Sequence, residues 1–261
     1  MARNRRNLAN RTSWQPKGSR RRVVSGRLVG FLLLLVAIAA VGAYFAVFSP
    51  LLWEQQVNVK GAKTISQDAV VRAAEDAAEQ HFGPISTRSL VLVNTGAVAD
   101  AIKRKHDDIA AIEVTKRWPN GLDVDITERQ STLLWQSHDG YYLVDGQGIA
   151  FDKATPQEKL IKVEDSAGLP VELGKRVASA RFIKALQDIR RDMATAGLKV
   201  TGFRIPESTF EVQAITDQGY YALFDTTRSA SFQVDALKRA VEKAKPKEYA
   251  DLQVPGRVYV K

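Results

Sequence analysis

The feature that most constrains this chain is a run of 21 residues without a charged side chain, from Leu28 to Phe48. A helix rises about 1.5 Å per residue, so a run of this length matches the ~30 Å hydrocarbon core of a bilayer. The run is apolar on every face and is followed by Ser49 and Pro50, which disfavours a buried core helix. We therefore expect residues 28–48 to form a transmembrane helix.

A cleavable signal peptide is the alternative interpretation of this run. Val41, Gly42 and Ala43 are small residues of the kind that precede a cleavage site. The apolar region of a secretory signal, however, is only about 7–15 residues long. The greater length favours an uncleaved signal anchor.

The charge of the chain is divided unevenly between the two sides of this helix. The whole chain has 38 basic and 29 acidic residues, a net charge of +9. Residues 1–27 contain nine basic and no acidic residues, which leaves 38 − 9 = 29 basic and 29 acidic residues in the remainder. A basic flank stays in the cytoplasm, so the N-terminus is expected there and everything after Phe48 outside, the single-pass type II topology. The neutral remainder disfavours a nucleic-acid partner, because phosphate binding requires a cationic surface.

Residues 54–128 have the pattern of a small α+β domain. Residues 56–61 alternate between polar and apolar and predict a strand; a helix follows, capped at Thr64 or Ser66 and terminated at Gly83-Pro84, with His81 in its last turn. The pattern then predicts a second helix from Thr95 or Gly96 to Lys105, and strands over 112–118 and 122–128. This strand–helix–helix–strand–strand order predicts a three-stranded sheet covered by two helices.

The two last strands of this domain form the best-defined local structure. A three-residue loop over Pro119-Asn120-Gly121 places Trp118 opposite Leu122 and Arg117 opposite Asp123, which keeps one face apolar. Gly121 would then take the left-handed position of a type I turn with a bulge. We expect Trp118 to lie in the core rather than to contact a partner, which is the alternative for this residue.

Several motifs in this order resemble the FtsQ/DivIB family of cell-division proteins. The matching residues are Val57-Asn58-Val59-Lys60-Gly61, Arg117-Trp118-Pro119, Val124-Asp125-Ile126-Thr127-Glu128-Arg129, Trp135, Tyr142-Leu143-Val144-Asp145, Gly148 and Phe151. Gln130-Ser131-Thr132 departs from the family, which often has a proline soon after the Glu-Arg pair. The resemblance implies a basic cytoplasmic tail (1–27), a signal anchor (28–48), a POTRA domain (54–128) and a C-terminal FtsQ-like β-rich domain (129–261).

Residues 129–261 predict a mixed α/β domain with a largely antiparallel sheet. A four-residue loop over 145–148 would pair Val144 with Ile149 and Tyr142 with Phe151. An amphipathic helix is expected over 179–196, strands over 200–205, 210–215 and 220–224, and a short helix over 235–245. Residues 252–254 and 258–260 read as one last strand, interrupted at Pro255.

Proline cannot donate to a central ladder, so this last strand is expected at a sheet edge or bulge. An exposed edge can pair with a strand of another chain, although an ordinary terminal strand would show the same pattern. The residues predicted for such a partner-binding edge are Tyr249, Leu252, Val254, Arg257, Val258 and Tyr259. In the family, the resemblance implies, this region recruits the division proteins FtsB (DivIC in some lineages) and FtsL. Weaker candidates for docking on the POTRA domain are Lys60, Gly61 and Arg117.

Sequence motifs for an enzyme are absent. The chain has no cysteine, and none of its three histidines, His81, His106 and His138, belongs to a close metal-ligand pair. We expect no catalytic residue, cofactor, metal or small-molecule substrate. The predicted function is a non-enzymatic division scaffold in the cell membrane, enriched at the septum. The alternative is a membrane-anchored extracytoplasmic enzyme, or enzyme subunit, of envelope biogenesis whose site has no known motif.

Overall fold

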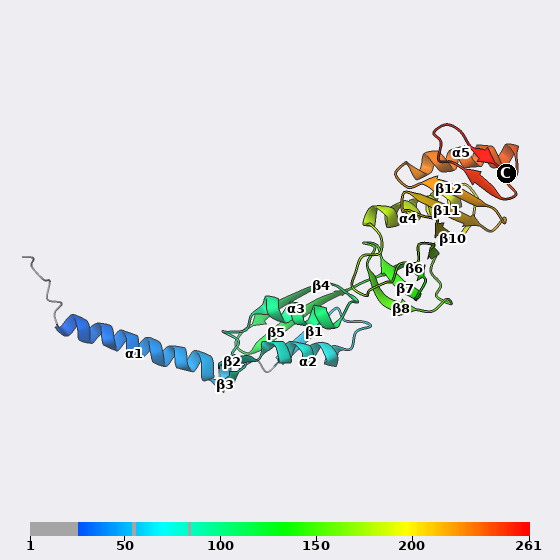
Figure 1. Cartoon of the computed structure of the whole chain (residues 1–261). Helices are drawn as coiled ribbons and strands as arrows, with labels where there is room; N and C mark the ends of the chain where they lie inside the picture. The colour runs from blue at the N-terminus through cyan, green and yellow to red at the C-terminus, as the bar shows by residue number, and fades with distance from the viewer. Residues whose placement is uncertain (1–25, 54–55, 83–84) are drawn as a thin grey trace, which may run out of the picture. The chain divides into compact units, whose positions relative to one another are not determined.

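The computed structural model describes residues 26–53, 56–82 and 85–261 (Figure 1). Its first element is the helix α1 (Gly26–Phe48), which has 23 residues, none of them buried. Among the described residues α1 is the one helix long and apolar enough to cross a membrane. It begins two residues before the predicted span and ends at the predicted residue. The predicted basic tail lies almost wholly outside the described residues.

The next elements form a three-stranded sheet with two helices. Its strand order is β1-β5-β4, with β1 parallel to β5 and β5 antiparallel to β4. Val70, Val98 and Leu122 are among the fully buried residues between the helices and the sheet. The elements are η1 (Pro50–Leu52), β1 (Gln56–Lys60), α2 (Gln67–Ala78), β2 (Gln80–Phe82), β3 (Ile85–Thr87), α3 (Thr95–Lys105), β4 (Ile109–Arg117) and β5 (Gly121–Glu128).

The first helix of this sheet domain is shorter than predicted. Ser66 is its N-cap residue and Thr64 is not. The helix ends at Ala78, and His81 lies in β2, which pairs with β3 as a separate two-stranded sheet. Helical spacing continued past Ala78 in the sequence, but the C-cap residue Glu79 has an extended backbone, and the strand β2 begins at Gln80. The second helix, α3, has the predicted bounds and is capped by the Asn94 side chain.

The β4–β5 hairpin has the predicted parity but a register shifted by two residues. Arg117 pairs with Gly121, and Lys116 with Leu122, so the loop consists of residues 118–120. The prediction that Gly121 is left-handed was wrong, because Gly121 is the first residue of β5 and lies beside Gln56 of β1. The Arg117 side chain lies across Gly121, 2.9 Å from where a Cβ would be. Trp118 is 59% exposed, so its predicted place in the core was also wrong.

The C-terminal region contains a nine-stranded, largely antiparallel sheet with two helices. The strand order is β14-β13-β12-β11-β10-β9-β6-β7-β8. The strands are β6 (Ser131–Ser137), β7 (Gly140–Asp145), β8 (Ala150–Ala154), β9 (Lys162–Asp165), β10 (Val200–Ile205), β11 (Glu211–Thr216), β12 (Tyr221–Asp225), β13 (Tyr249–Asp251) and β14 (Tyr259–Val260). The helices are α4 (Ala180–Thr195) and α5 (Ala230–Lys243).

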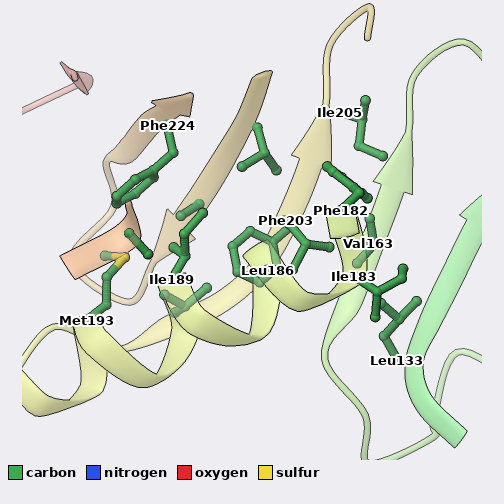
Figure 2. Packing of buried hydrophobic residues seen from close by; sticks show 14 of the residues in the cluster. Leu133, Val163, Phe182, Ile183, Leu186, Ile189, Met193, Phe203, Ile205 and Phe224 are labelled. Carbon is green, nitrogen blue, oxygen red and sulfur yellow. The ribbon is translucent and has the colours of Figure 1, made fainter. Parts of the chain in front are cut away.

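The core of this region forms where α4 packs on the sheet. Figure 2 shows the apolar side chains of α4 directed at residues from strands far apart in the sequence. Ser179 caps the helix through a bond from the Phe182 N–H, and Gly197, with φ +80°, follows its end. The predicted stripe of α4 is confirmed, since all its members are buried: Phe182, Leu186, Ile189 and Met193.

Three details differ from the sequence prediction. A bulge at Phe151 in β8 places Val144 opposite Ala150 and Tyr142 opposite Lys153, so Ile149 is not in the ladder. The helix α5 begins at Ala230, five residues early, because buried Gln233 bonds the backbone of Asp225 and anchors an extra first turn. The last strand is two strands, β13 and β14, which pair with each other, and Pro255 lies in the turn between them.

Candidate partner-binding surfaces

Glu128, the last residue of β5, fixes the loop between β1 and α2. Its Oε1 accepts hydrogen bonds from three consecutive backbone N–H groups, of Lys63 at 2.6 Å, Thr64 at 2.7 Å and Ile65 at 3.0 Å. The bond from Ile65 contributes most, and together the bonds lower the pKa of the Glu128 carboxyl from 4.5 to about 2. An ionised carboxylate is therefore part of the fold at neutral pH.

Gly61 allows the same loop to approach β5 closely. Its φ is +83°, a left-handed conformation that favours glycine. A Cβ at this position would overlap the carbonyl oxygen of Ile126. The glycine at the end of β1 thus has a structural role, independent of any partner.

The three candidate docking residues of this sheet do not form one site. Lys60 is opposite Asp125 at one end of β1, whereas Arg117 bonds Gln56 at the other end, at 3.1 Å. Four residues of strand separate Gln56 and Lys60, roughly 13 Å. Arg117 also forms an ion pair with Asp123 at 3.5 Å. The candidate docking residues therefore belong to two surfaces, one with Lys60 and Gly61 and the other with Arg117.

Arg129 links the end of β5 to the following sheet. Its Nη1 lies 2.5 Å from Oδ2 of Asp145, and both side chains are more than 90% buried. Its Nε donates to the carbonyl of Asp107, and the other oxygen of Asp145 accepts from the N–H groups of Gln147 and Ile149. This network, which sequence reasoning missed, orders the junction and the β7–β8 turn together. Arg129 and Asp145 both belong to the motifs of the sequence, but no pattern in the sequence indicated that their side chains form an ion pair.

The C-terminal edge places the six predicted partner-binding residues in different environments. Val254 and Tyr259 are 42% and 47% exposed, and Arg257 is also exposed. Tyr249 is half-buried and stacks on Tyr221, with ring centroids 6.0 Å apart.

The other two residues point to the core rather than to solvent. Leu252 is 2% exposed, and its carbonyl accepts a bond from Arg228, while Val258 packs partly against the core. The exposed part of the predicted edge therefore consists of Val254, Arg257 and Tyr259.

Comparison with known proteins identifies the domain that contains the three-stranded sheet. A family model described as POTRA domain, FtsQ-type, matches residues 55–129. Residues 55–129 form a POTRA domain of the FtsQ type.

The remainder of the chain is covered by similarity to individual proteins. Over 94% of its length the chain is 28% identical to the cell division protein FtsQ of Mycobacteroides abscessus and 26% identical to that of Mycobacterium leprae. Over 68% of its length it is 29% identical to the FtsQ protein of Streptomyces coelicolor. The chain spans 70%, 64% and 64% of the lengths of these relatives. The resemblance to the FtsQ/DivIB family is confirmed.

The motifs that carry this resemblance have structural explanations in and next to the POTRA domain. Gly61 and Glu128 hold its first loop, and Arg129 with Asp145 holds the junction that follows. Gly148, with φ +78°, lies where a Cβ would overlap the carbonyl of Ala178. These motif residues therefore form a structural frame that holds the fold together. Candidate docking surfaces have to be sought at the exposed edges of the sheets.

The outer edge of β14 is a candidate surface of this kind in the C-terminal sheet. The Lys261 N–H donates to the Tyr249 carbonyl at 3.0 Å, on the side of β13. Successive N–H groups of a strand point to opposite sides, so the N–H of Val260 faces away from β13. Sequence reasoning missed Val260, because its role depends on the pairing of β13 with β14.

The described residues contain no group of three or more His, Asp or Glu side chains that could hold a metal ion. His81 lies in β2, His106 is the C-cap of α3 and His138 lies between β6 and β7. A surface cavity of about 410 Å³ between α4 and the start of α5 is lined mainly by charged and hydroxyl side chains, among them Arg181, Asp188 and Ser229.

Proposed function

We propose that this protein is a membrane-anchored, non-enzymatic scaffold of cell division, whose outer domains bind other membrane-anchored division proteins at the septum. The observation that carries the proposal is a POTRA domain of the FtsQ type directly behind a helix long enough to span a membrane. Similarity to proteins named cell division protein FtsQ along 94% of the chain supports it. The anchor confines the protein to the membrane surface, where its partners are also confined.

The proposed topology has the N-terminus in the cytoplasm and both sheets outside. Nine basic residues precede the span, and the remainder has no net charge. A positively charged flank of this kind is retained on the cytoplasmic side. Protease protection of the N-terminus in intact cells, with exposure of the C-terminal sheet, is the expected result.

The proposed partners at the C-terminal edge are proteins like FtsB or DivIC and FtsL. The edge strand β14 is short and carries exposed Tyr259 beside the outward N–H of Val260. A strand of a partner would continue the sheet through main-chain hydrogen bonds, with Val254 and Arg257 at its side. Pairing of this kind depends on backbone groups, so it tolerates side-chain changes better than loss of an N–H.

Val260→Pro and Val260→Thr form a matched pair that tests the edge. Proline removes the outward N–H and leaves the bonds of Lys261 to β13, whereas threonine keeps the N–H and the branched shape. We expect Val260→Pro to lose co-purification of the FtsB-like partner from membranes and Val260→Thr to keep it. Equal capture by two folded variants would refute pairing at this edge.

The division role itself is tested by localisation and depletion. A fluorescent fusion is expected at midcell in dividing cells, and depletion is expected to give filaments. A uniform membrane distribution together with normal division on depletion would overturn the proposed role. Val260→Pro should then reach midcell but fail to bring its partner there, which separates the anchor's role from that of the edge.

A further inference from the structure

One end of the POTRA domain exposes three apolar side chains from separate segments. Leu51 in η1 is 78% exposed, Trp118 at the β4–β5 turn is 59% exposed, and Val91 in the segment before α3 is 41% exposed. Exposed apolar residues scattered singly need no explanation. These three are different, because hydrogen bonds bring their segments to the same end of the domain.

The segment that leaves the membrane helix is bonded to this end. The Thr87 hydroxyl donates to the carbonyl of Val47, in the last turn of α1, at 2.8 Å. Trp53 forms a β-bridge with Ser89. Leu51 follows the end of α1 by three residues, so it lies within about 10 Å of Phe48 by chain length alone.

The hairpin turn with Trp118 is joined to the same region. Arg117 donates to the Gln56 side chain at 3.1 Å, at the start of β1, and the Lys116 Nζ donates to the Val91 carbonyl at 3.1 Å. Gln56 follows Phe48 by only eight residues. The tip of the hairpin therefore lies at the end of the domain that faces the membrane exit, and not at the far end with Lys60.

The chemistry of this end matches the interface between lipid and water. Tryptophan combines a large apolar ring with a polar N–H and is enriched at that interface. Arg117 and Lys116 stand beside Trp118, and long basic side chains can place their charge at headgroups while their stems cover apolar surface. The headgroup region is about 5–8 Å thick on each side of the hydrocarbon core.

We propose that the membrane-proximal end of the POTRA domain, formed by Leu51, Val91 and Trp118, lies in the headgroup region of the bilayer that α1 spans. The domain then rests on the membrane at two connected points, the helix exit and the hairpin tip. Its first sheet is held at a fixed height above the lipid. The inference rests on α1 spanning a bilayer and is independent of the C-terminal docking edge.

Single cysteines provide the test, since the natural chain has none. The full-length protein is reconstituted in phosphatidylcholine–phosphatidylglycerol vesicles with a nitroxide label at Trp118→Cys or Val91→Cys. The controls are Phe210→Cys and Phe232→Cys, at exposed apolar residues of the C-terminal sheet region, and Leu34→Cys within the span. The readout is the collision rate of each label with lipid-soluble oxygen and with a water-soluble nickel chelate.

We expect severalfold lower collision with nickel, and higher collision with oxygen, at 118 and 91 than at 210 and 232. Nickel access at 118 and 91 equal to the controls overturns the inference, as does exclusion of both reagents, which would mean that protein covers this end. The label at 34 reports separately whether α1 is in the bilayer, so failure of the anchor is distinguishable. Because labelling removes the tryptophan, the unlabelled protein is compared with Trp118→Phe: headgroup-labelled lipid should quench the fluorescence that this substitution removes.

Discussion

Replacing Glu128 by glutamine removes one charge from the POTRA domain and little volume. The carboxylate accepts three backbone hydrogen bonds, from Lys63, Thr64 and Ile65, at 2.6 to 3.0 Å. A glutamine carbonyl can still accept at this place, but without the charge that strengthens such bonds. The expected result is a looser β1–α2 loop and a less stable domain.

The magnitude follows from the pKa of Glu128, which the fold lowers from 4.5 to about 2. At ~1.4 kcal/mol per pKa unit this shift corresponds to at most about 3.4 kcal/mol. The group is only half-buried and solvent screens it, so we expect the variant to lose about 1–2 kcal/mol at pH 7. The pKa of Glu128 is lower in the folded than in the unfolded protein, so this stabilisation is fully present about one pH unit above 4.5 and higher. It is lost as pH falls from 4.5 toward 2.

Hydrogen exchange of the full-length protein, followed in peptides that cover residues 61–73, measures the effect locally. At pH 7 exchange through opening of the domain should be about 5- to 30-fold faster in Glu128→Gln than in the natural chain. After correction for intrinsic rates, the difference between the two proteins should shrink as pH falls from 4.5 toward 2. Glu113→Gln, an exposed change on β4, is the control. A difference that does not depend on pH, or none at pH 7, would refute the reasoning.

Two further pairs of substitutions, at Gly148 and Gly197 and at Arg129, test the frame of the C-terminal sheet. Gly148 and Gly197 both have φ near +80°, so replacing Gly197 by alanine should lower the folding stability by about 1 kcal/mol. An alanine at position 148 would also overlap the Ala178 carbonyl, so chemical denaturation should show a clearly larger loss of stability for that variant. Equal losses for the two variants would contradict the close approach at Gly148. Arg129→Met leaves the buried carboxylate of Asp145 without its cation, so thermal unfolding should show a loss of folding stability of about 3 kcal/mol. Arg129→Lys keeps a cation and should lose less. An unchanged unfolding midpoint in Arg129→Met would show that the ion pair contributes nothing to stability.

Local patterns predicted the elements whose stabilising contacts lie close in sequence. The helix α4 was expected over 179–196 because its apolar spacing, its serine cap and Gly197 all agree, and it was found over Ala180–Thr195. The β4–β5 hairpin was predicted in parity but not in register. Its register depends on the Arg117 side chain, which lies across Gly121 toward Gln56, a residue about 60 positions away.

Features fixed by distant contacts were not predictable in this way. The apolar spacing of α2 continues in the sequence past the last residue of the helix, Ala78. The helix ends early because the residues that follow form β2, which pairs with β3. Residues 252–254 and 258–260 were predicted to form one interrupted strand. Only the fold shows that β13 and β14 pair with each other, which buries Leu252 and leaves Val260 at the outer edge.

The residues that reveal the family are those least suited to distinguish its partners. Gly61, Glu128, Arg129 and Gly148 are held by backbone contacts within the chain, so any member with this frame needs similar chemistry there. A substitution at one of them can weaken binding of the proposed partners by destabilising the frame, and the loss would then be mistaken for the loss of a direct contact. For the proposed partners we expect selectivity to come from exposed groups that no motif requires, such as Tyr259 at the edge. Partner assays on this protein should therefore vary the edge while a measured folding stability shows that the frame is intact.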